Sequence, residues 1–352
     1  MGNSYKQTSE SRIICFDYLR VVAVYFVIII HLAAQNWYSA DPQSTVWKIF
    51  NFYDSMARWA VPIYVMISGY LFLSREYEIR TIYLKYICRM IIVLVVWSSI
   101  YALFHGGNAK TIVLRSISVA EVHLWFIPMI IGLYICLPFL KKIVESEVIM
   151  RYFLVVGFIF SFLLPWLVMN VEYFGGTLLK EVVYSLNKEI DNMKLSFVKG
   201  YHFYFILGYY LFKKELSKKN RYTIYGLGVV GFIATVFLTE CSSVRMATPI
   251  GDYYSYFSLN VLLESVAVFV WFRYHCYSFL NLNIFINKMA KYSFGAYLVH
   301  FLIIRCLEKA EITTMSFYQI LSVPILSVIV FISSFLISVI LNHIPYVKRY
   351  MV

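Results

Sequence analysis

The sequence predicts an all-α integral membrane protein with about ten transmembrane helices, both termini in the cytoplasm and no soluble domain. Three observations lead to this prediction. Of the 352 residues, 61% are hydrophobic and only 14% are charged, whereas a soluble domain carries about 25% charged residues. Apolar runs also recur along the whole chain, and a transmembrane helix needs roughly 20 such residues.

Each apolar run is expected to form a helix. Backbone groups inside lipid must hydrogen-bond within the protein, so only helices or a closed barrel can span a bilayer. These runs are continuous rather than alternating with period two, which favours helices. The first run contains Arg20 and precedes many others, which indicates a retained helix rather than a cleaved signal. The predicted spans are 13–34, 55–73, 87–105, 122–140, 152–169, 198–212, 222–239, 254–272, 289–308 and 317–341.

The basic residues predict the orientation. Most of the 31 Lys and Arg residues lie in alternate connectors, and basic residues mark cytoplasmic loops. The net charge of +12 therefore reports topology, and nucleic-acid binding is not expected because no soluble basic domain exists. The longest connector on the other side, 170–197, is predicted to be a loop of mixed charge. The connectors assigned to the cytoplasm are 1–12, 74–89, 141–151, 213–221, 273–291 and 342–352.

The first span carries three ionisable residues, Asp17, Arg20 and His31. Charged groups inside a membrane are costly and are functional candidates. At about 100° per residue, Arg20 and His31 point within about 20° of each other, and all three residues fall within about 60°. This stripe is predicted to face the bundle interior, with His31 about 16 Å further along the axis than Arg20. A buried polar contact that pins helices together is the alternative.

Histidine suits proton transfer near neutral pH. A neutral imidazole at His31 could accept the proton of an alcohol while the alcohol oxygen attacks an activated acyl group. Nearby arginine or backbone donors would stabilise the developing charge. The sequence contains no HExxH or other metal-binding pattern, and its six cysteines form no CxxC pair, so no metal site is predicted.

Other polar residues in the predicted spans are weaker candidates. His123 beside Trp125 is typical of a membrane interface, and Arg58 is one turn from Asp54, which favours a structural ion pair. Glu264 has no obvious local partner. Pro62 predicts a kink in the second span. The candidates for supporting roles or the acceptor side are Arg58, Ser68, His123, Trp125, Glu264, Ser293 and His300.

The connector 74–89 contains a cluster of basic residues, including Arg80, Lys85 and Arg89. Such a cluster is common in cytoplasmic loops. It also suits the docking of a phosphorylated donor, because Arg and Lys bind phosphate well.

Four sequence blocks resemble the membrane-bound acyltransferase-3 family, in order along the chain. The first is Asp17-x-Leu19-Arg20 followed by His31. The second is Ser55-x-x-Arg58-x-x-Val61-Pro62 through Met66-Ile67-Ser68-Gly69-Tyr70-Leu71-Phe72. The third is His123-Leu124-Trp125-Phe126 with Gly132-Leu133-Tyr134 and Pro138. The fourth is Tyr292-Ser293-Phe294-Gly295-x-Tyr297-Leu298-x-His300. The likeness is strongest to bacterial enzymes that O-acetylate a surface sugar polymer, including the enterobacterial-common-antigen type.

The resemblance implies one acyltransferase domain over residues 1–352 in the bacterial inner membrane. It implies transfer of an acyl group, usually acetyl, from cytosolic acetyl-CoA to a hydroxyl of a glycan such as O-antigen or common antigen. No permanently bound cofactor is implied. His31 would be the catalytic base, Asp17 and Arg20 would support the donor end, and Arg89, Lys85 and Arg80 would contact acyl-CoA. The chain departs from the family's Arg-x-x-Arg pattern, because Tyr86 stands where the first arginine is expected.

Two other functions fit the composition. A transporter or flippase for a lipid-linked glycan would also use many helices and intramembrane charges, and it would be expected to contain inverted repeats. A polymerase of glycan repeat units would ordinarily have a larger outer loop than 170–197. The acceptor sugar, the acyl length, the choice between lipid-linked precursor and finished polymer, and the oligomeric state are left open by the sequence.

Overall fold

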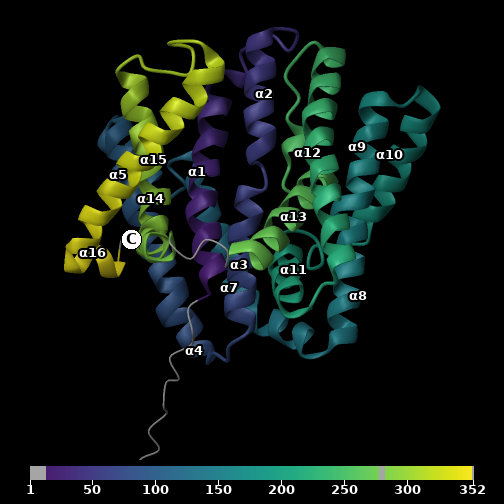
Figure 1. The fold of residues 1–352 in the computed structure, drawn as a ribbon, viewed down its shortest axis with the longest axis horizontal. Coiled ribbons are helices and arrows are strands. Elements are labelled where there is room, and N and C mark those ends of the chain that lie inside the picture. The colour runs from purple at the N-terminus through teal and green to yellow at the C-terminus, as the bar shows by residue number, and fades with distance from the viewer. Residues whose placement is uncertain (1–12, 277–281, 351–352) are drawn as a thin grey trace, which may run out of the picture.

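A computed structural model describes residues 13–276 and 282–350 of the chain. All regular elements within these residues are helical, and they form one bundle (Figure 1). The all-α prediction is therefore confirmed for the described part of the chain. The predicted cytoplasmic connector 1–12 lies outside the described residues.

Eight helical segments of the described chain are long and apolar enough to cross a membrane. Several of them combine two or three consecutive helices. In chain order they are α1 (Ile14–Trp37), α2 (Thr45–Ala57) with α3 (Ala60–Leu73), α4 (Ile79–Thr81) with η1 (Ile82–Ile87) and α5 (Cys88–His105), η2 (Val122–Trp125) with α7 (Phe126–Glu145), α8 (Glu147–Phe158) with η3 (Ile159–Leu163) and α9 (Leu164–Phe174), α12 (Lys218–Met246), η4 (Asp252–Tyr254) with α13 (Leu259–His275), and α15 (Gln319–His343).

Five further helices complete the described structure: α6 (Ala109–Ser116), α10 (Thr177–Asn192), the short α11 (Tyr201–Lys213), α14 (Asn283–Lys309) and α16 (Pro345–Tyr350). The sixth and ninth predicted spans correspond to α11 and α14. The 13 residues of α11 extend only about 20 Å at 1.5 Å per residue, whereas the hydrocarbon core is about 30 Å thick. Because α11 packs on α3 and α14 packs on α1, both belong to the bundle, and the count of ten spans stays a prediction.

The second predicted span is interrupted at a different place from the one expected. Helix α2 begins at Thr45, where the Ser44 hydroxyl accepts a hydrogen bond from the Trp47 amide at 3.1 Å. The helix then breaks at Arg58 and Trp59, before Pro62. Pro62 lies in the first turn of α3, where a helix does not need the missing N–H. Arg58 therefore lies at a break between two helices and not at a proline kink.

The predicted loop 170–197 is mostly helical, so that prediction is wrong. Helix α9 continues to Phe174, a turn follows at Gly175 and Gly176, and α10 covers Thr177–Asn192. The charges of α10 alternate with apolar residues such as Leu178 and Val182, so its average composition resembles a loop although it forms an amphipathic helix. The α9–α10 pair lies at the edge of the bundle (Figure 1).

Helix α1 lies at the centre of the bundle, where it packs against α2, α3, α14 and α15. This position buries most of its side chains. A polar residue that faces the interior from α1 is therefore surrounded by several helices, and residues of these helices can join it to form a site.

Glycines allow α3 and α11 to approach closely. A Cβ atom at Gly69 would lie 1.9 Å from the carbonyl oxygen of Phe205, and one at Gly208 would lie 2.2 Å from that of Met66. These separations are far below van der Waals contact. Small residues at helix interfaces are the usual means of close packing in membranes.

We expect Gly208→Ala to separate α3 from α11 and to destabilise the protein by about 1–3 kcal/mol, the usual cost of overpacking a core. The thermal midpoint of the detergent-purified protein measures this effect. Gly132→Ala is the matched control, because a Cβ at Gly132 meets nothing within 4 Å. Equal midpoints for the two variants would contradict the close packing.

Candidate functional site

Helix α1 directs its predicted stripe into the bundle. Asp17 is buried, and the Arg20 guanidinium lies 3.4 Å from an Asp17 carboxylate oxygen. The Tyr64 hydroxyl donates a hydrogen bond of 2.9 Å to the Arg20 carbonyl oxygen, which ties α3 to this part of α1. His31 lies further along the same helix and packs against residues of α14.

Three histidines from three different elements meet in the interior, and we call them the histidine cluster: His31 on α1, His123 on η2 and His300 on α14. The ring centroids of His31 and His300 are 5.3 Å apart, those of His123 and His300 are 5.0 Å apart, and those of His31 and His123 are 6.4 Å apart. His123, which the sequence favours as a membrane-interface residue, is only 1% exposed. That interpretation is wrong because η2 turns the His123 side chain inward.

The cluster keeps nitrogen atoms available for proton transfer. Nδ1 of His300 lies within hydrogen-bond distance of the Tyr297 carbonyl oxygen. A carbonyl oxygen can only accept, so Nδ1 of neutral His300 carries the proton and Nε2 keeps its lone pair. That Nε2 and both ring nitrogens of His123 are buried without a hydrogen-bond partner among the described residues. Unpartnered buried polar atoms are rare in folded proteins and mark functional candidates.

An ion network borders the cluster on its side nearest the ends of α1 and α14. The Phe301 ring packs against the rings of both His31 and His123, and the Arg305 guanidinium lies 4.9 Å from the Phe301 ring centroid. Arg305 in turn contacts a Glu121 carboxylate oxygen at 3.0 Å. Neither residue could be predicted from the sequence, since Glu121 and Arg305 are far apart in the chain and no local spacing pairs them.

A central cavity of about 360 Å³ opens on the other side of the cluster. It brings together four predicted candidates, Arg20, Ser68, Arg89 and Ser293, from α1, α3, α5 and α14. The remaining lining is largely apolar. The cavity therefore combines two arginines and two serine hydroxyls with a wall of mostly aliphatic and aromatic side chains.

Three neighbouring aromatic rings line the central cavity, and we call them the aromatic layer: Tyr64, Phe126 and Tyr297, of which Tyr297 contacts the histidine cluster. Their centroids are 5.8 to 6.5 Å apart, and all three line the cavity. The Tyr297 hydroxyl donates a hydrogen bond to the His123 carbonyl oxygen, and its ring lies 5.6 Å from that of His300. The sequence blocks contained Tyr297, but helix periodicity did not distinguish it from a core residue.

A basic pocket of about 600 Å³ lies at the α4 end of the bundle. The predicted donor-side residues Arg80, Lys85 and Arg89 all line it. Arg89 also lines the central cavity. One side chain is thus common to the basic pocket at the end of the bundle and to the cavity that leads toward the histidine cluster.

Tyr86, which occupies the position expected for an arginine, does not line the basic pocket. Its ring packs 5.0 Å from that of Phe72 and 5.5 Å from that of Tyr77. Burial, with a contribution from the Tyr86 phenol, raises the pKa of Tyr77 to about 12. Both phenols therefore belong to an aromatic wall, and the neighbouring Lys85 contributes a positive charge to the pocket beside Arg80 and Arg89. Lys85 and Tyr86 lie on the π-helical turn η1, a feature that is frequent at functional sites.

A tyrosine pocket of about 240 Å³ lies toward the opposite end of the bundle. Arg58 lines it, forms an ion pair with Asp54 and lies 4.2 Å from the Tyr254 ring centroid. Trp125 stacks on Tyr256, another residue of the pocket, at 5.8 Å. The expected Asp54–Arg58 ion pair is confirmed, and it holds Arg58 in a pocket rather than only joining turns of a helix. The full lining is Tyr38, Arg58, Tyr201, Gly251, Tyr254, Ser255, Tyr256 and Phe257.

Glu264, another predicted candidate, lines neither the central cavity, the basic pocket nor the tyrosine pocket. Its carboxylate accepts a hydrogen bond from the Thr235 hydroxyl. It lines a separate apolar groove between α1, α2, α12 and α13. A partner on the neighbouring helix therefore explains how this acid is accommodated.

A model of an acyltransferase domain family matches residues 13–343, which is nearly the whole chain. No curated protein and no solved structure matches the chain.

Proposed function

The chain belongs to the acyltransferase-3 family, and from this premise we propose that it transfers an acyl group, acetyl in the first instance, from cytosolic acetyl-CoA to a hydroxyl of a lipid-linked or cell-surface glycan. The family and the apolar helices make it a multi-pass membrane acyltransferase. Beyond this family-level function, we propose the identity of the acyl donor, the class of acceptor, the catalytic and binding residues, and the bacterial inner membrane as the location.

The observation that carries the proposal is the position of Arg89 between two cavities. The basic pocket can hold the phosphates of CoA, because Arg and Lys bind phosphate through charge-assisted hydrogen bonds. Arg89 also lines the central cavity, whose largely apolar walls suit the pantetheine arm. The far end of that cavity is the aromatic layer, which contacts the histidine cluster. A thioester on a flexible arm would pass Tyr297 to reach His31.

The proposed reaction needs one base and no bound cofactor. A ring nitrogen of His31 accepts the proton of the acceptor hydroxyl while that oxygen forms a bond to the thioester carbonyl carbon. The carbon–sulfur bond then breaks, and the CoA thiolate leaves and takes the proton from the imidazolium. The products are an O-acyl ester and CoA thiol, so protons and electrons balance. General-base catalysis of this kind typically contributes 10²–10⁴-fold.

The tyrosine pocket suits the acceptor. It offers aromatic faces together with hydroxyl groups and one guanidinium, Arg58. Such side chains bind a ligand that has both apolar and polar faces, as a sugar does. In the proposed orientation the basic pocket faces the cytosol, in agreement with the distribution of Lys and Arg, and the tyrosine pocket faces the opposite side of the membrane.

We expect acetyl-CoA to stabilise the purified protein against heat. A ligand that binds only the folded state, at a concentration of about 100 times its Kd, adds about 2.7 kcal/mol to the free energy of unfolding. The measurement is the thermal midpoint in detergent with acetyl-CoA, with CoA and without either ligand. A transporter or polymerase of a lipid-linked glycan would show no such stabilisation, and an unchanged midpoint would contradict the proposed donor.

A further inference from the structure

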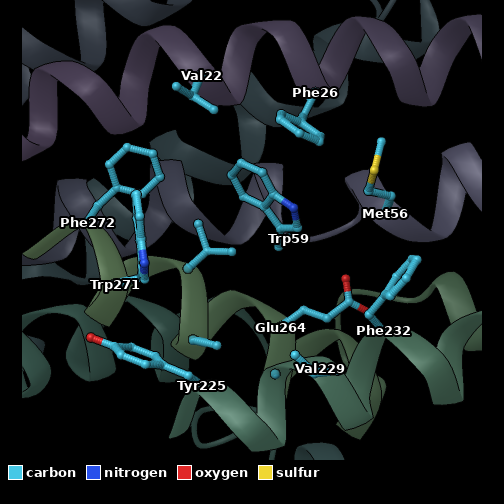
Figure 2. Close-up of a pocket in the computed structure, with 13 residues that line it drawn as sticks. Val22, Phe26, Met56, Trp59, Tyr225, Val229, Phe232, Glu264, Trp271 and Phe272 are labelled. Atoms are coloured by element: carbon cyan, nitrogen blue, oxygen red, sulfur yellow. The ribbon is translucent and has the colours of Figure 1, made fainter. Parts of the chain in front are cut away.

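The apolar groove that contains Glu264 lies outside the proposed acyl path. Its volume is about 450 Å³, and Figure 2 shows Phe26, Trp59, Phe232 and Trp271 around it. The other lining residues are Val22, Met56, Tyr225, Gly228, Val229, Glu264, Ala267, Val268 and Phe272. The Glu264 carboxylate accepts a hydrogen bond from the Thr235 hydroxyl, and most of the other lining side chains are apolar, so the groove offers a nearly continuous hydrocarbon-like surface.

The groove opens on a face of α12 that suits lipid contact. Val229 lines the groove and is 58% exposed, and its neighbour Val230 is 56% exposed without lining it. Ile233 and Phe237, further along α12, are also exposed. A helix face of exposed aliphatic residues in a membrane protein faces hydrocarbon. A groove that opens on this face is accessible to a hydrocarbon chain of the bilayer.

One stripe of α12 continues from the groove to the basic end of the bundle. Lys218, Arg221, Tyr225, Val229 and Phe232 are spaced by three or four residues, so they share one helix face. The stripe is basic in the first turns of the helix and apolar beyond. This order matches the order of a lipid, with a charged head followed by a chain.

The surroundings of Arg221 favour an acidic headgroup. Its guanidinium lies 4.3 Å from the Tyr274 ring centroid, and its Nε is buried without a hydrogen-bond partner among the described residues. The nearby acid, Glu215, forms an ion pair with Arg273 at 2.6 Å. Lys218 and Arg221 thus remain as an excess of positive charge where the stripe meets the membrane surface.

We propose that the apolar groove binds one chain of an acidic glycerophospholipid whose phosphate lies against Lys218 and Arg221. The length of the stripe supports a lipid of one leaflet. Phe232 lies 11 positions after Arg221, a rise of about 16 Å, which is about half of the hydrocarbon thickness of about 30 Å. Basic side chains near the membrane surface attract anionic headgroups, so an acidic lipid is preferred to a neutral one.

This site rests on the membrane placement of the bundle but not on acyl transfer, and its test does not use enzyme activity. The protein is reconstituted into phosphatidylcholine vesicles containing phosphatidylglycerol and re-extracted in mild detergent, and native mass spectrometry counts the lipid retained. Wild type is expected to retain one phosphatidylglycerol. Val229→Trp, which fills the groove, is expected to reduce retention at least about tenfold, the effect of losing about 1.4 kcal/mol. Val230→Trp is expected to retain the lipid, since it faces away from the groove.

A second pair of variants tests the headgroup. Arg221→Gln is expected to reduce the preference for phosphatidylglycerol over phosphatidylcholine, because only Lys218 then remains at the headgroup, whereas Lys219→Gln, on another face of α12, keeps the full preference. Equal retention of both lipids by wild type would overturn the proposal, as would identical retention by Val229→Trp and Val230→Trp. If Val229→Trp fails to give a cooperative thermal transition, the comparison of Arg221→Gln with Lys219→Gln decides the question.

Discussion

Replacing His31 by alanine is expected to lower acyl transfer, and the slow hydrolysis of acetyl-CoA by the purified enzyme, by about 10²–10⁴-fold, the usual contribution of a positioned general base. His31 lies where the stripe of α1 meets the other two histidines, 5.3 Å from the His300 ring and 4.9 Å from that of Phe301. Loss of its imidazole removes the proposed base. Release of CoA thiol measures the rate.

The control for His31→Ala is His343→Ala. His343 is an exposed histidine of α15 whose Nδ1 lies 2.8 Å from the Val339 carbonyl oxygen, within the same helix, so its loss is expected to leave the rate unchanged. Stabilisation by acetyl-CoA should persist in His31→Ala, because the basic pocket and the central cavity do not include His31. A rate in His31→Ala close to that of wild type would refute the assignment of the base.

Site residues that lie on one helix could be predicted from the sequence, because helix geometry determines which of them share a face. Asp17, Arg20 and His31 share a face of α1 by periodicity alone. The same argument could not bring His123 and His300 to His31, since these residues reach the cluster through the packing of η2 and α14 around α1. His123 was misjudged because a histidine beside Trp125 has the composition of an interface, and only the turn at η2 directs it inward.

The fold shows the same division between local and tertiary information. Hydropathy identified the apolar runs, but it could not distinguish the amphipathic α10 from a mixed loop. It could not locate the break at Arg58 either, because Pro62 marks the first turn of α3 rather than a kink. Glu264 seemed to lack a partner since Thr235 lies on the adjacent α12, and sequence spacing gives no sign of that contact.

Replacing Arg89 by alanine is expected to raise the KM for acetyl-CoA by about 10- to 100-fold while lowering kcat less. A hydrogen bond to a charged group is worth about 1.5–3 kcal/mol, and each 1.4 kcal/mol is tenfold in affinity. Arg89 lines both the basic pocket and the central cavity, so its loss weakens donor binding without removing the base. Steady-state kinetics with varied acetyl-CoA separate the two effects.

Two comparisons make the Arg89 prediction specific. Arg89→Lys should recover part of the affinity, because lysine keeps the charge but lacks the planar fork that contacts two phosphate oxygens. Arg151→Ala is the matched control: this arginine is exposed and pairs with Glu147 one turn away on α8, and surface ion pairs of this kind contribute little. Equal changes in KM for Arg89→Ala and Arg151→Ala would show that general positive charge, rather than the junction of the two cavities, attracts the donor. A larger change at Arg89, partly restored by lysine, would place the CoA phosphates at the junction of the basic pocket and the central cavity. Lys85, beside this junction, would then supply the positive charge that is lost where Tyr86 stands in place of an arginine.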